Sequence, residues 1–288
     1  MYKCYGDRIT MKHFDPKSVD FVIYHADCID GFGAAYAAWK LLGNDAKYYP
    51  AKHGDPPPDV TGKTVAIVDF SYSRQTIEKL QTSTKNLIIL DHHKTARDEL
   101  EKLDCAIFDM SHSGAMLSWM YFHPDVPPPE FIRMIEDADL WRWSLSNTRN
   151  FVAAFYNEPY IFDVYDSYND KMKLGDIIVK GANIREHMDV LVKKSCEKSF
   201  VTNFCGYKTR IVNSPNFQSD IGNVLVSQFD CDVGFIWYYD HAAKRCIVSL
   251  RSCKDDVDVS KLAQKFGGGG HPRAAGFQWV NDIEKLLN

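Results

Sequence analysis

The chain has 288 residues, a length that suits two ordinary domains or one large one. It is 45% hydrophobic and 25% charged, as in a globular protein, and its formal net charge of −4 argues against a broad basic surface that grips long duplex DNA. The chain has eight cysteines but no CxxC pair, and no signal-peptide pattern appears at the start. No apolar run approaches the roughly 18 residues of a membrane span. These features predict reduced thiols, no membrane association and a cytoplasmic location.

Four short apolar runs in the first half of the chain predict buried strands. They are continuous and rich in β-branched residues, which is typical of parallel strands buried on both faces. The runs are 21–24, 65–68, 87–90 and 106–108. The segments between them, at 31–42, 73–80 and 95–103, have helical composition or helix-capping residues at their start. This alternation of strand and helix predicts an α/β fold with a parallel sheet.

The middle of the chain is predicted to be helical, and strands return after it. Helices are expected at 130–140 and over 174–199, the latter as one or two helices, with strands at 210–213, 233–239 and 246–250. A run of glycines follows at 267–270. The expected organisation is a parallel-sheet domain at 18–185, a helical linker at 186–204 and a smaller α/β domain at 205–288.

Acidic and histidine side chains follow the expected strands of the first domain. They are His25, Asp27 and Asp30 after the first run, Asp69 after the second, Asp91, His92 and His93 after the third, and Asp109 after the fourth. The ligand crevice of an open α/β sheet lies at the carboxyl ends of its strands, so these side chains are expected to converge. Crowded carboxylates repel one another, and a bound cation removes that repulsion. Carboxylate oxygens with imidazole nitrogens suit Mn²⁺, Mg²⁺, Fe²⁺ or Zn²⁺, and an oxygen-rich site favours Mn²⁺ or Mg²⁺.

Two groups of motifs, in this order, resemble the DHH phosphoesterase family. The first group comprises Asp91-His92-His93, which resembles the family signature, His25-x-Asp27-x-x-Asp30-Gly31, Asp69 and the segment 136–141. The second is the segment 267–276, which resembles the glycine-rich loop of the DHH-associated C-terminal domain. The resemblance covers roughly residues 20 to 278 and is nearest to small oligoribonuclease and nucleotide phosphodiesterase members. It implies a metal-binding catalytic domain joined to a substrate-binding domain.

The resemblance implies a role for each matching side chain. Two divalent cations are expected, most of all Mn²⁺, with Mg²⁺ or Co²⁺ as alternatives. The implied metal ligands are His25 and Asp27 at the first metal, Asp30, His92 and an acid of the segment 136–141 at the second, and Asp69 between the two. Asp91 is expected to orient the neighbouring histidine, and His93 to donate a hydrogen bond to the scissile phosphate. His112 has no counterpart in the family motifs and is expected to be structural.

Two positions in the first domain stay open. The family spaces the two acids of its first motif as Asp-x-Asp, whereas Asp27 and Asp30 lie three residues apart here and Cys28 stands two residues before Asp30. Either Asp27 reaches the metal or Cys28 takes its place. In the segment 136–141, Asp139 fits the family pattern better, and Asp137 is the alternative.

The second domain is expected to bind substrate. Consecutive glycines let backbone N–H groups approach and cradle a phosphate. The expected contacts are Gly268, Gly269, Gly270, His271 and Arg273, together with Arg251, whose guanidinium could form a bidentate fork with the same phosphate. Two domains that face each other across a cleft would favour short substrates.

The expected function is metal-dependent hydrolysis of phosphodiester bonds in short single-stranded oligonucleotides or small nucleotides, with release of 5′-mononucleotides. The alternatives are hydrolysis of inorganic polyphosphate or pyrophosphate, single-stranded DNA exonuclease activity, and binding without cleavage. The choice between RNA, DNA and cyclic dinucleotide, the polarity of cleavage and the formation of a homodimer stay open.

Overall fold

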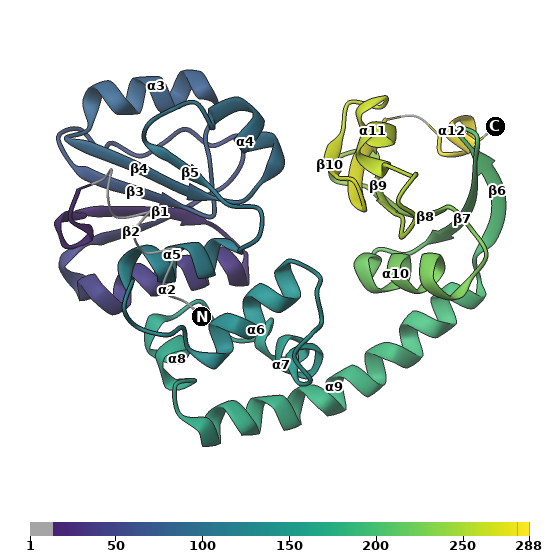
Figure 1. Cartoon of the computed structure of the whole chain (residues 1–288). Coiled ribbons are helices and arrows are strands. Elements are labelled where there is room, and N and C mark those ends of the chain that lie inside the picture. Colours follow the sequence, from purple (N-terminus) through teal and green to yellow (C-terminus); the bar gives the residue numbers. More distant parts are fainter. Residues whose placement is uncertain (1–13, 281, 288) are drawn as a thin grey trace. The chain divides into compact units, whose positions relative to one another are not determined.

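The computed structural model describes residues 14–280 and 282–287, which form two compact units that divide after Arg185. The first unit contains a parallel sheet with helices on both faces, and the second contains a mixed sheet (Figure 1). In this part of the chain, no helix is long and apolar enough to cross a membrane. Its cysteines are free thiols.

Five parallel strands form the sheet of the first unit, in the order β2-β1-β3-β4-β5. They are β1 (Phe21–His25), β2 (Lys47–Ala51), β3 (Thr64–Val68), β4 (Asn86–Asp91) and β5 (Ala106–Phe108). The four predicted apolar runs form β1, β3, β4 and β5, which confirms the predicted α/β fold. Sequence analysis missed β2, because this edge strand is mostly solvent-accessible and contains Pro50 instead of an apolar run.

Side chains of the parallel strands alternate between the two faces of the sheet. Val22 and Ala66 pack toward one pair of helices, while Ile23 and Ile67 pack toward the other pair. The first pair is α2 (Ile29–Leu42) and α5 (Gly114–Phe122), and the second is α3 (Arg74–Ser83) and α4 (Lys94–Leu100). Because both faces are covered, the central strands β1, β3 and β4 are largely apolar, and their acidic and histidine side chains lie at or just after the strand ends.

The strand order creates a switch point beside β1. The chain passes from β1 to β2 on one side and then returns to β3 on the other side. Sheets with the order 2-1-3-4-5 bind ligands at the carboxyl ends of the first and third strands, where the connections diverge. His25 and Asp69 lie at these two strand ends.

The remaining helices of the first unit pack on α2, on α5 or on one another. The short helices η1 (Pro16–Ser18) and η2 (Gly43–Asp45) flank the first strands, and α6 (Glu130–Asp139), α7 (Thr148–Phe155) and α8 (Phe162–Ser167) follow α5. Tyr36 of α2 is fully buried among aromatic side chains of these helices, including Phe131 and Tyr165. The long helix α9 (Lys171–Glu197) continues across the division at Arg185.

The second unit is a six-stranded mixed sheet in the order β10-β11-β9-β8-β7-β6. The strands are β6 (Phe200–Phe204), β7 (Tyr207–Asn213), β8 (Val233–Asp240), β9 (Arg245–Arg251), β10 (Gly269–His271) and β11 (Ala274–Trp279). One face packs on α11 (Val259–Gln264) and α12 (Glu284–Leu287). The other face packs on α10 (Gln218–Gln228) and the last turns of α9.

The segment predicted as a helical linker at 186–204 is helical only up to Glu197, and β6 follows it. Cys205 and Gly206 both have positive φ, at 54° and 90°. A two-residue turn of this kind joins antiparallel strands tightly, and it pairs Phe204 with Tyr207. The prediction extended the helix too far: the charged residues near the start of the segment suggested a helix throughout, but the β6–β7 hairpin begins within it. Sequence analysis also missed β10 and β11, because glycine and alanine carry little strand signal.

Candidate metal centre

Six side chains converge at the carboxyl edge of the parallel sheet. His25 ends β1, Asp69 follows β3, His92 and His93 follow β4, Asp30 lies in the first turn of α2, and Asp139 ends α6. With Cys28, they form three overlapping groups whose potential ligand atoms lie within 4.8 Å of one another. The groups are His25–Cys28–Asp69, Asp69–His92–His93 and Asp30–His92–Asp139. Asp69 and His92 each belong to two groups, so the arrangement offers adjoining sites.

His92 lies at the centre of three carboxylates. Its Nε2 atom is 3.2 Å from Asp69 Oδ1, 3.6 Å from Asp139 Oδ2 and 3.7 Å from Asp30 Oδ2. Asp30 and Asp69 are buried, with 0% and 2% of their surface exposed. Such a concentration of negative charge has to be balanced by positive charge or by bound protons.

The electrostatic environment separates these carboxyl groups. Burial and then the charges of Asp69 and Asp139 raise the pKa of Asp30 well above its ordinary value. Desolvation within the cluster is also the main reason why the pKa of Asp139 rises to about 6, although part of this residue is exposed to solvent. Burial alone would raise the pKa of Asp69 as well, but His25 and His92 hold that pKa below its ordinary value. The charged form is therefore favoured more strongly at Asp69 than at Asp30 or Asp139.

Two buried polar atoms of the centre have no hydrogen-bond partner. They are His25 Nδ1 and Asp69 Oδ1; His92 Nε2 lies 3.2 Å from Asp69 Oδ1 but without hydrogen-bond geometry. His25 Nδ1 lies 3.5 Å from Asp69 Oδ2, which is long for a hydrogen bond. Buried polar atoms are almost always satisfied in folded proteins. The unsatisfied atoms, together with the excess of carboxylates, fit a set of residues that holds divalent cations.

Asp91 organises the turn that presents the two histidines. Its Oδ1 atom accepts hydrogen bonds from the backbone N–H groups of His92 and His93, at 2.7 and 3.1 Å. The same oxygen lies 2.7 Å from His93 Nδ1, and Oδ2 accepts a hydrogen bond from Ser71 Oγ at 2.6 Å. Although burial lowers the pKa of His93, Asp91 raises it above its ordinary value. Asp91 thus positions the histidines and favours the protonated form of His93.

The N-terminus of α5 holds Asp30 in place. The backbone N–H groups of Gly114 and Ala115 donate hydrogen bonds to Asp30 Oδ2 and Oδ1, at 2.7 and 3.1 Å. Ser113 caps this helix by accepting a hydrogen bond from Met116 N. A Cβ atom on Gly114 would lie 2.3 Å from Asp69 Cβ, so only glycine lets the helix approach this closely.

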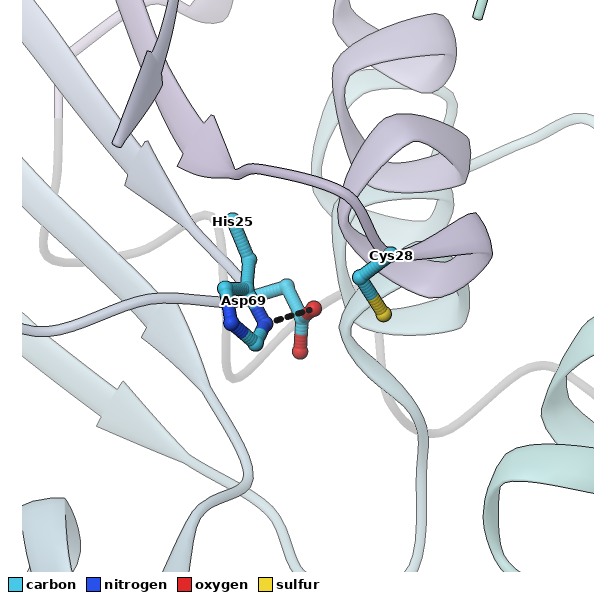
Figure 2. Close-up of side chains that lie close together, drawn as sticks. All are labelled: His25, Cys28 and Asp69. Atoms are coloured by element: carbon cyan, nitrogen blue, oxygen red, sulfur yellow. Dashed lines mark ion pairs between the residues drawn. The ribbon is translucent and has the colours of Figure 1, made fainter. Parts of the chain in front are cut away.

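The two acids left open by the sequence lie outside the three ligand groups. The Asp27 side chain is 72% exposed and forms an ion pair with Lys52 at 2.6 Å, whereas Cys28 lies beside His25 and Asp69 (Figure 2). Asp137 is buried and accepts hydrogen bonds from backbone and hydroxyl groups of the segment 144–148. The structure thus brings Cys28 and Asp139 into the cluster.

Sequence analysis missed His53. Its ring lies 5.5 Å from the ring of His25 and 4.8 Å from that of Phe70, between centroids. It follows β2 at the same edge of the sheet as the cluster, so a correct prediction of β2 would have pointed to it. By contrast, His112 binds Glu136 Oε1 at 2.6 Å through Nδ1, in keeping with a structural role.

In the second unit, Arg251 ends β9 on the face that packs against α10. Its Nη2 atom donates a hydrogen bond to Ser219 Oγ at 2.7 Å, and Gly222 leaves room for its stem, since a Cβ there would lie 2.5 Å from Arg251 Cγ. Among the described residues, no carboxylate forms an ion pair with Arg251. Arg273, in contrast, forms an exposed ion pair with Asp255 at 2.6 Å.

The glycine run forms an edge strand and the turn before it. Gly269, Gly270 and His271 pair with β11. A Cβ on Gly268 would lie 2.1 Å from Gly276 O, and Gly270 has a φ of 140°, so both positions require glycine. Beside the run lies a groove of about 580 Å³, whose lining includes Gly267, Gly268 and Ser249.

The sequence matches one family model and is similar to two known proteins. A family model described as the DHHA1 domain matches residues 219–288. Uncharacterized protein R106 of Acanthamoeba polyphaga mimivirus is 33% identical over 286 residues, which cover 91% of this chain and 68% of that protein. Oligoribonuclease NrnB of Bacillus subtilis is 22% identical over 253 residues, which cover 77% of this chain and 60% of NrnB. The chain thus spans about two thirds of the curated relatives it matches.

The chain also resembles several solved structures in fold. The DHH domain of PF0399, a member of the s1p family of ribosomal proteins, matches with a TM-score of 0.62 at 14% identity, over 94% of this chain and 85% of that one. RecJ from Thermus thermophilus with Mn²⁺ matches with a TM-score of 0.56 at 13% identity, over 98% and 52%. The pGpG-specific phosphodiesterase PggH from Vibrio cholerae matches with a TM-score of 0.52 at 12% identity, over 93% and 96%.

Proposed function

The chain belongs to the DHH phosphoesterase family, and we propose that it uses two divalent cations to hydrolyse phosphodiester bonds in short oligonucleotides or small nucleotides, releasing 5′-mononucleotides. The observation that carries the proposal is the cluster of His25, Asp30, Asp69, His92 and Asp139. The buried carboxylates of Asp30 and Asp69 and the unsatisfied polar atoms fit divalent cations.

The side chains of the cluster divide into two sets of ligands. Asp30, His92 and Asp139 would hold one cation, His25 would help to hold the other, and Asp69 would contact both. When bound, two such cations would supply a lowered pKa for an attacking water and charge neutralisation at the phosphoryl oxygens. Asp69 suits the shared position because it belongs to two of the three ligand groups and lies 3.2 Å from His92.

His93 is the proposed donor to the scissile phosphate. Asp91 accepts a hydrogen bond from its Nδ1 atom and favours the protonated ring. The Nε2–H group is then left to donate to an anionic oxygen. Among the described residues, Asp91 belongs to none of the three ligand groups. Its Oδ1 atom accepts hydrogen bonds from the turn after β4, and its Oδ2 atom accepts one from Ser71.

We propose that the second unit binds a phosphate of the substrate. Arg251 supports this role, since Ser219 orients its guanidinium and no described carboxylate neutralises it. Gly268, Gly269, Gly270, His271 and Arg273 remain proposed contacts, of which Arg273 already has an acidic partner. The name of the relative NrnB supports short oligoribonucleotides as the substrate class.

A turnover panel tests the proposal. The protein is stripped of metal, Mn²⁺ is restored, and products are separated by chromatography from a dinucleotide, a pentanucleotide, a cyclic dinucleotide, polyphosphate and a long single-stranded DNA. Asp69→Ala is expected to be inactive. Asp98→Ala, which alters an exposed acid of α4, is the matched control and should retain activity.

The products separate the alternatives. Mononucleotides released from the short RNAs alone would support the proposal. Phosphate released from polyphosphate alone would replace it with a polyphosphatase function. Degradation of the long DNA in preference to short RNA would indicate a single-stranded DNA exonuclease, and no cleavage of any substrate by a metal-loaded, folded protein would refute the proposed activity.

A further inference from the structure

Cys28 lies against the metal centre at a position that helix capping does not explain. It is the N-cap residue of α2, a position at which Asp, Asn, Ser or Thr typically stabilises a helix by about 1 kcal/mol. Its thiol makes no side-chain hydrogen bond that caps the helix. Instead, its Sγ atom groups with potential ligand atoms of His25 and Asp69, and Figure 2 shows the three side chains together.

We propose that Cys28 is a metal ligand, with His25 and Asp69, and that the position it forms takes a thiolate-binding cation such as Zn²⁺, Co²⁺ or Fe²⁺ in preference to Mn²⁺ or Mg²⁺. This inference rests on the proposed function, because it concerns one of the two cation positions of the same centre. It also replaces a uniform pair of Mn²⁺ ions with two positions of different chemistry.

The backbone explains why Cys28, rather than Asp27, faces the centre. Asp27 has a φ of 55°, in the left-handed region, and its carboxylate pairs with Lys52 in solvent. Cys28 has an extended backbone, with φ −129° and ψ 133°. The change of conformation between these two residues turns the acid outward and leaves the thiol beside Asp69.

The other two members of the group independently indicate a ligand. Asp69 is 2% exposed, and its Oδ1 atom has no hydrogen-bond partner. His25 Nδ1 is also buried without a partner. A cation held by Cys28, His25 and Asp69 would bind the Asp69 carboxylate and give a His25 ring nitrogen a partner.

The donor atoms determine the kind of cation. The group with Cys28 offers one sulfur, one nitrogen and one carboxylate, and three protein ligands leave coordination positions open, as in catalytic zinc sites. Thiolates select zinc and other softer transition metals, whereas carboxylates suit Mn²⁺ and Mg²⁺, and imidazole accepts several transition metals. The neighbouring group of Asp30, His92 and Asp139 offers two carboxylates and one imidazole, so it lacks this selectivity.

Optical spectroscopy with Co²⁺ tests the inference without any turnover. Metal-free protein is titrated with Co²⁺ while the thiolate-to-cobalt charge-transfer band is followed in the near ultraviolet, and calorimetry gives the stoichiometry. The wild-type band is expected to rise and saturate. Cys28→Ser should lose the band and keep the melting curve of the metal-free protein. Cys205→Ser, which alters an exposed thiol outside the centre, is the control that should retain the band.

Cys28→Asp provides a second, opposite readout. This variant replaces the sulfur with a carboxylate, so the preference for Zn²⁺ over Mn²⁺, measured by competition, should fall at least about tenfold. An unchanged preference would contradict the assignment even if Cys28→Ser were unstable.

The remaining outcomes separate this inference from the proposed function. Three outcomes would overturn the assignment of Cys28. The band could persist in Cys28→Ser, or the wild-type protein could bind Co²⁺ without a band. The wild-type protein could also fail to bind Co²⁺. If short RNAs are still hydrolysed, the proposed function stands. If the band depends on Cys28 but the protein cleaves no substrate of the panel, Cys28 remains assigned as a metal ligand. The proposed activity is then overturned.

Discussion

Replacing Asp137 with alanine should destabilise the first unit without involving the metal centre directly. The Asp137 carboxylate is buried and accepts four hydrogen bonds. They come from Ser144 N at 2.8 Å, Ser144 Oγ at 2.6 Å, Leu145 N at 3.1 Å and Thr148 Oγ1 at 2.6 Å. These bonds fasten the turn after α6 to the start of α7. Alanine would leave two backbone N–H groups without their acceptor.

The magnitude follows from the groups that lose their partner. Each hydrogen bond to a charged group contributes about 1.5–3 kcal/mol, and these contributions are not additive when water can reach part of the site. We expect a loss of about 3 kcal/mol in the free energy of unfolding. For a unit of this size, that loss lowers the melting temperature by about 6–12 °C.

Asp139→Ala is the contrasting variant, only two residues away. It removes one of three carboxylates that crowd around His92, so the stability of the metal-free protein should change by less than about 1 kcal/mol. Hydrolysis should fall by at least about a hundredfold because a proposed metal ligand is lost.

Thermal melts of metal-free protein and turnover assays on both variants provide the measurement. We expect Asp137→Ala to be unstable but to retain activity per folded molecule, and Asp139→Ala to be stable but inactive. The reverse pattern, with Asp137→Ala stable and inactive, would show that Asp137 is the metal ligand and would refute the interpretation.

Three further outcomes are expected. Gly114→Ala places a Cβ 2.3 Å from that of Asp69. Turnover should therefore fall, and the free energy of unfolding should drop by about 1–3 kcal/mol. Unchanged turnover would contradict the close approach of the two residues. Arg251→Gln should raise KM for a short RNA by about tenfold, or about 1.4 kcal/mol, while the metal-induced increase in melting temperature stays unchanged; an unaltered KM would remove this residue from substrate binding. Glu136 raises the pKa of His112 above its ordinary value, so their ion pair stabilises the fold fully below about pH 6.5 and less as the pH rises through the folded-state pKa. His112→Asn should therefore melt about 2–4 °C below wild type at pH 6, with a smaller difference at pH 9, and a difference that is constant with pH would contradict this account.

Much of the parallel sheet was predictable from the sequence because its central strands are buried on both faces. Burial on both faces requires continuous apolar runs, and these are visible without any knowledge of the partners of a strand. The DHH signature after β4 was visible for the same reason, since polar residues that interrupt such runs stand out. The edge strand β2, with its exposed residues and Pro50, carries no such signal.

The conformations of Asp27, Cys28 and Asp137 were decided only in the tertiary structure. Sequence spacing placed Asp27 and Cys28 equally well, but a positive φ at Asp27 directs its carboxylate toward Lys52. Asp137 and Asp139 are two residues apart on one helix, and the turn that follows the helix captures only Asp137.

The sequence by itself determined the family, the α/β architecture and the set of side chains from which the centre is built, because apolar runs and short motifs are local properties of the chain. Only the tertiary structure decided which of these side chains meet. Ligand groups form between residues of different elements, and their membership depends on backbone dihedral angles and close contacts, such as that of Gly114 with Asp69, that spacing alone does not encode.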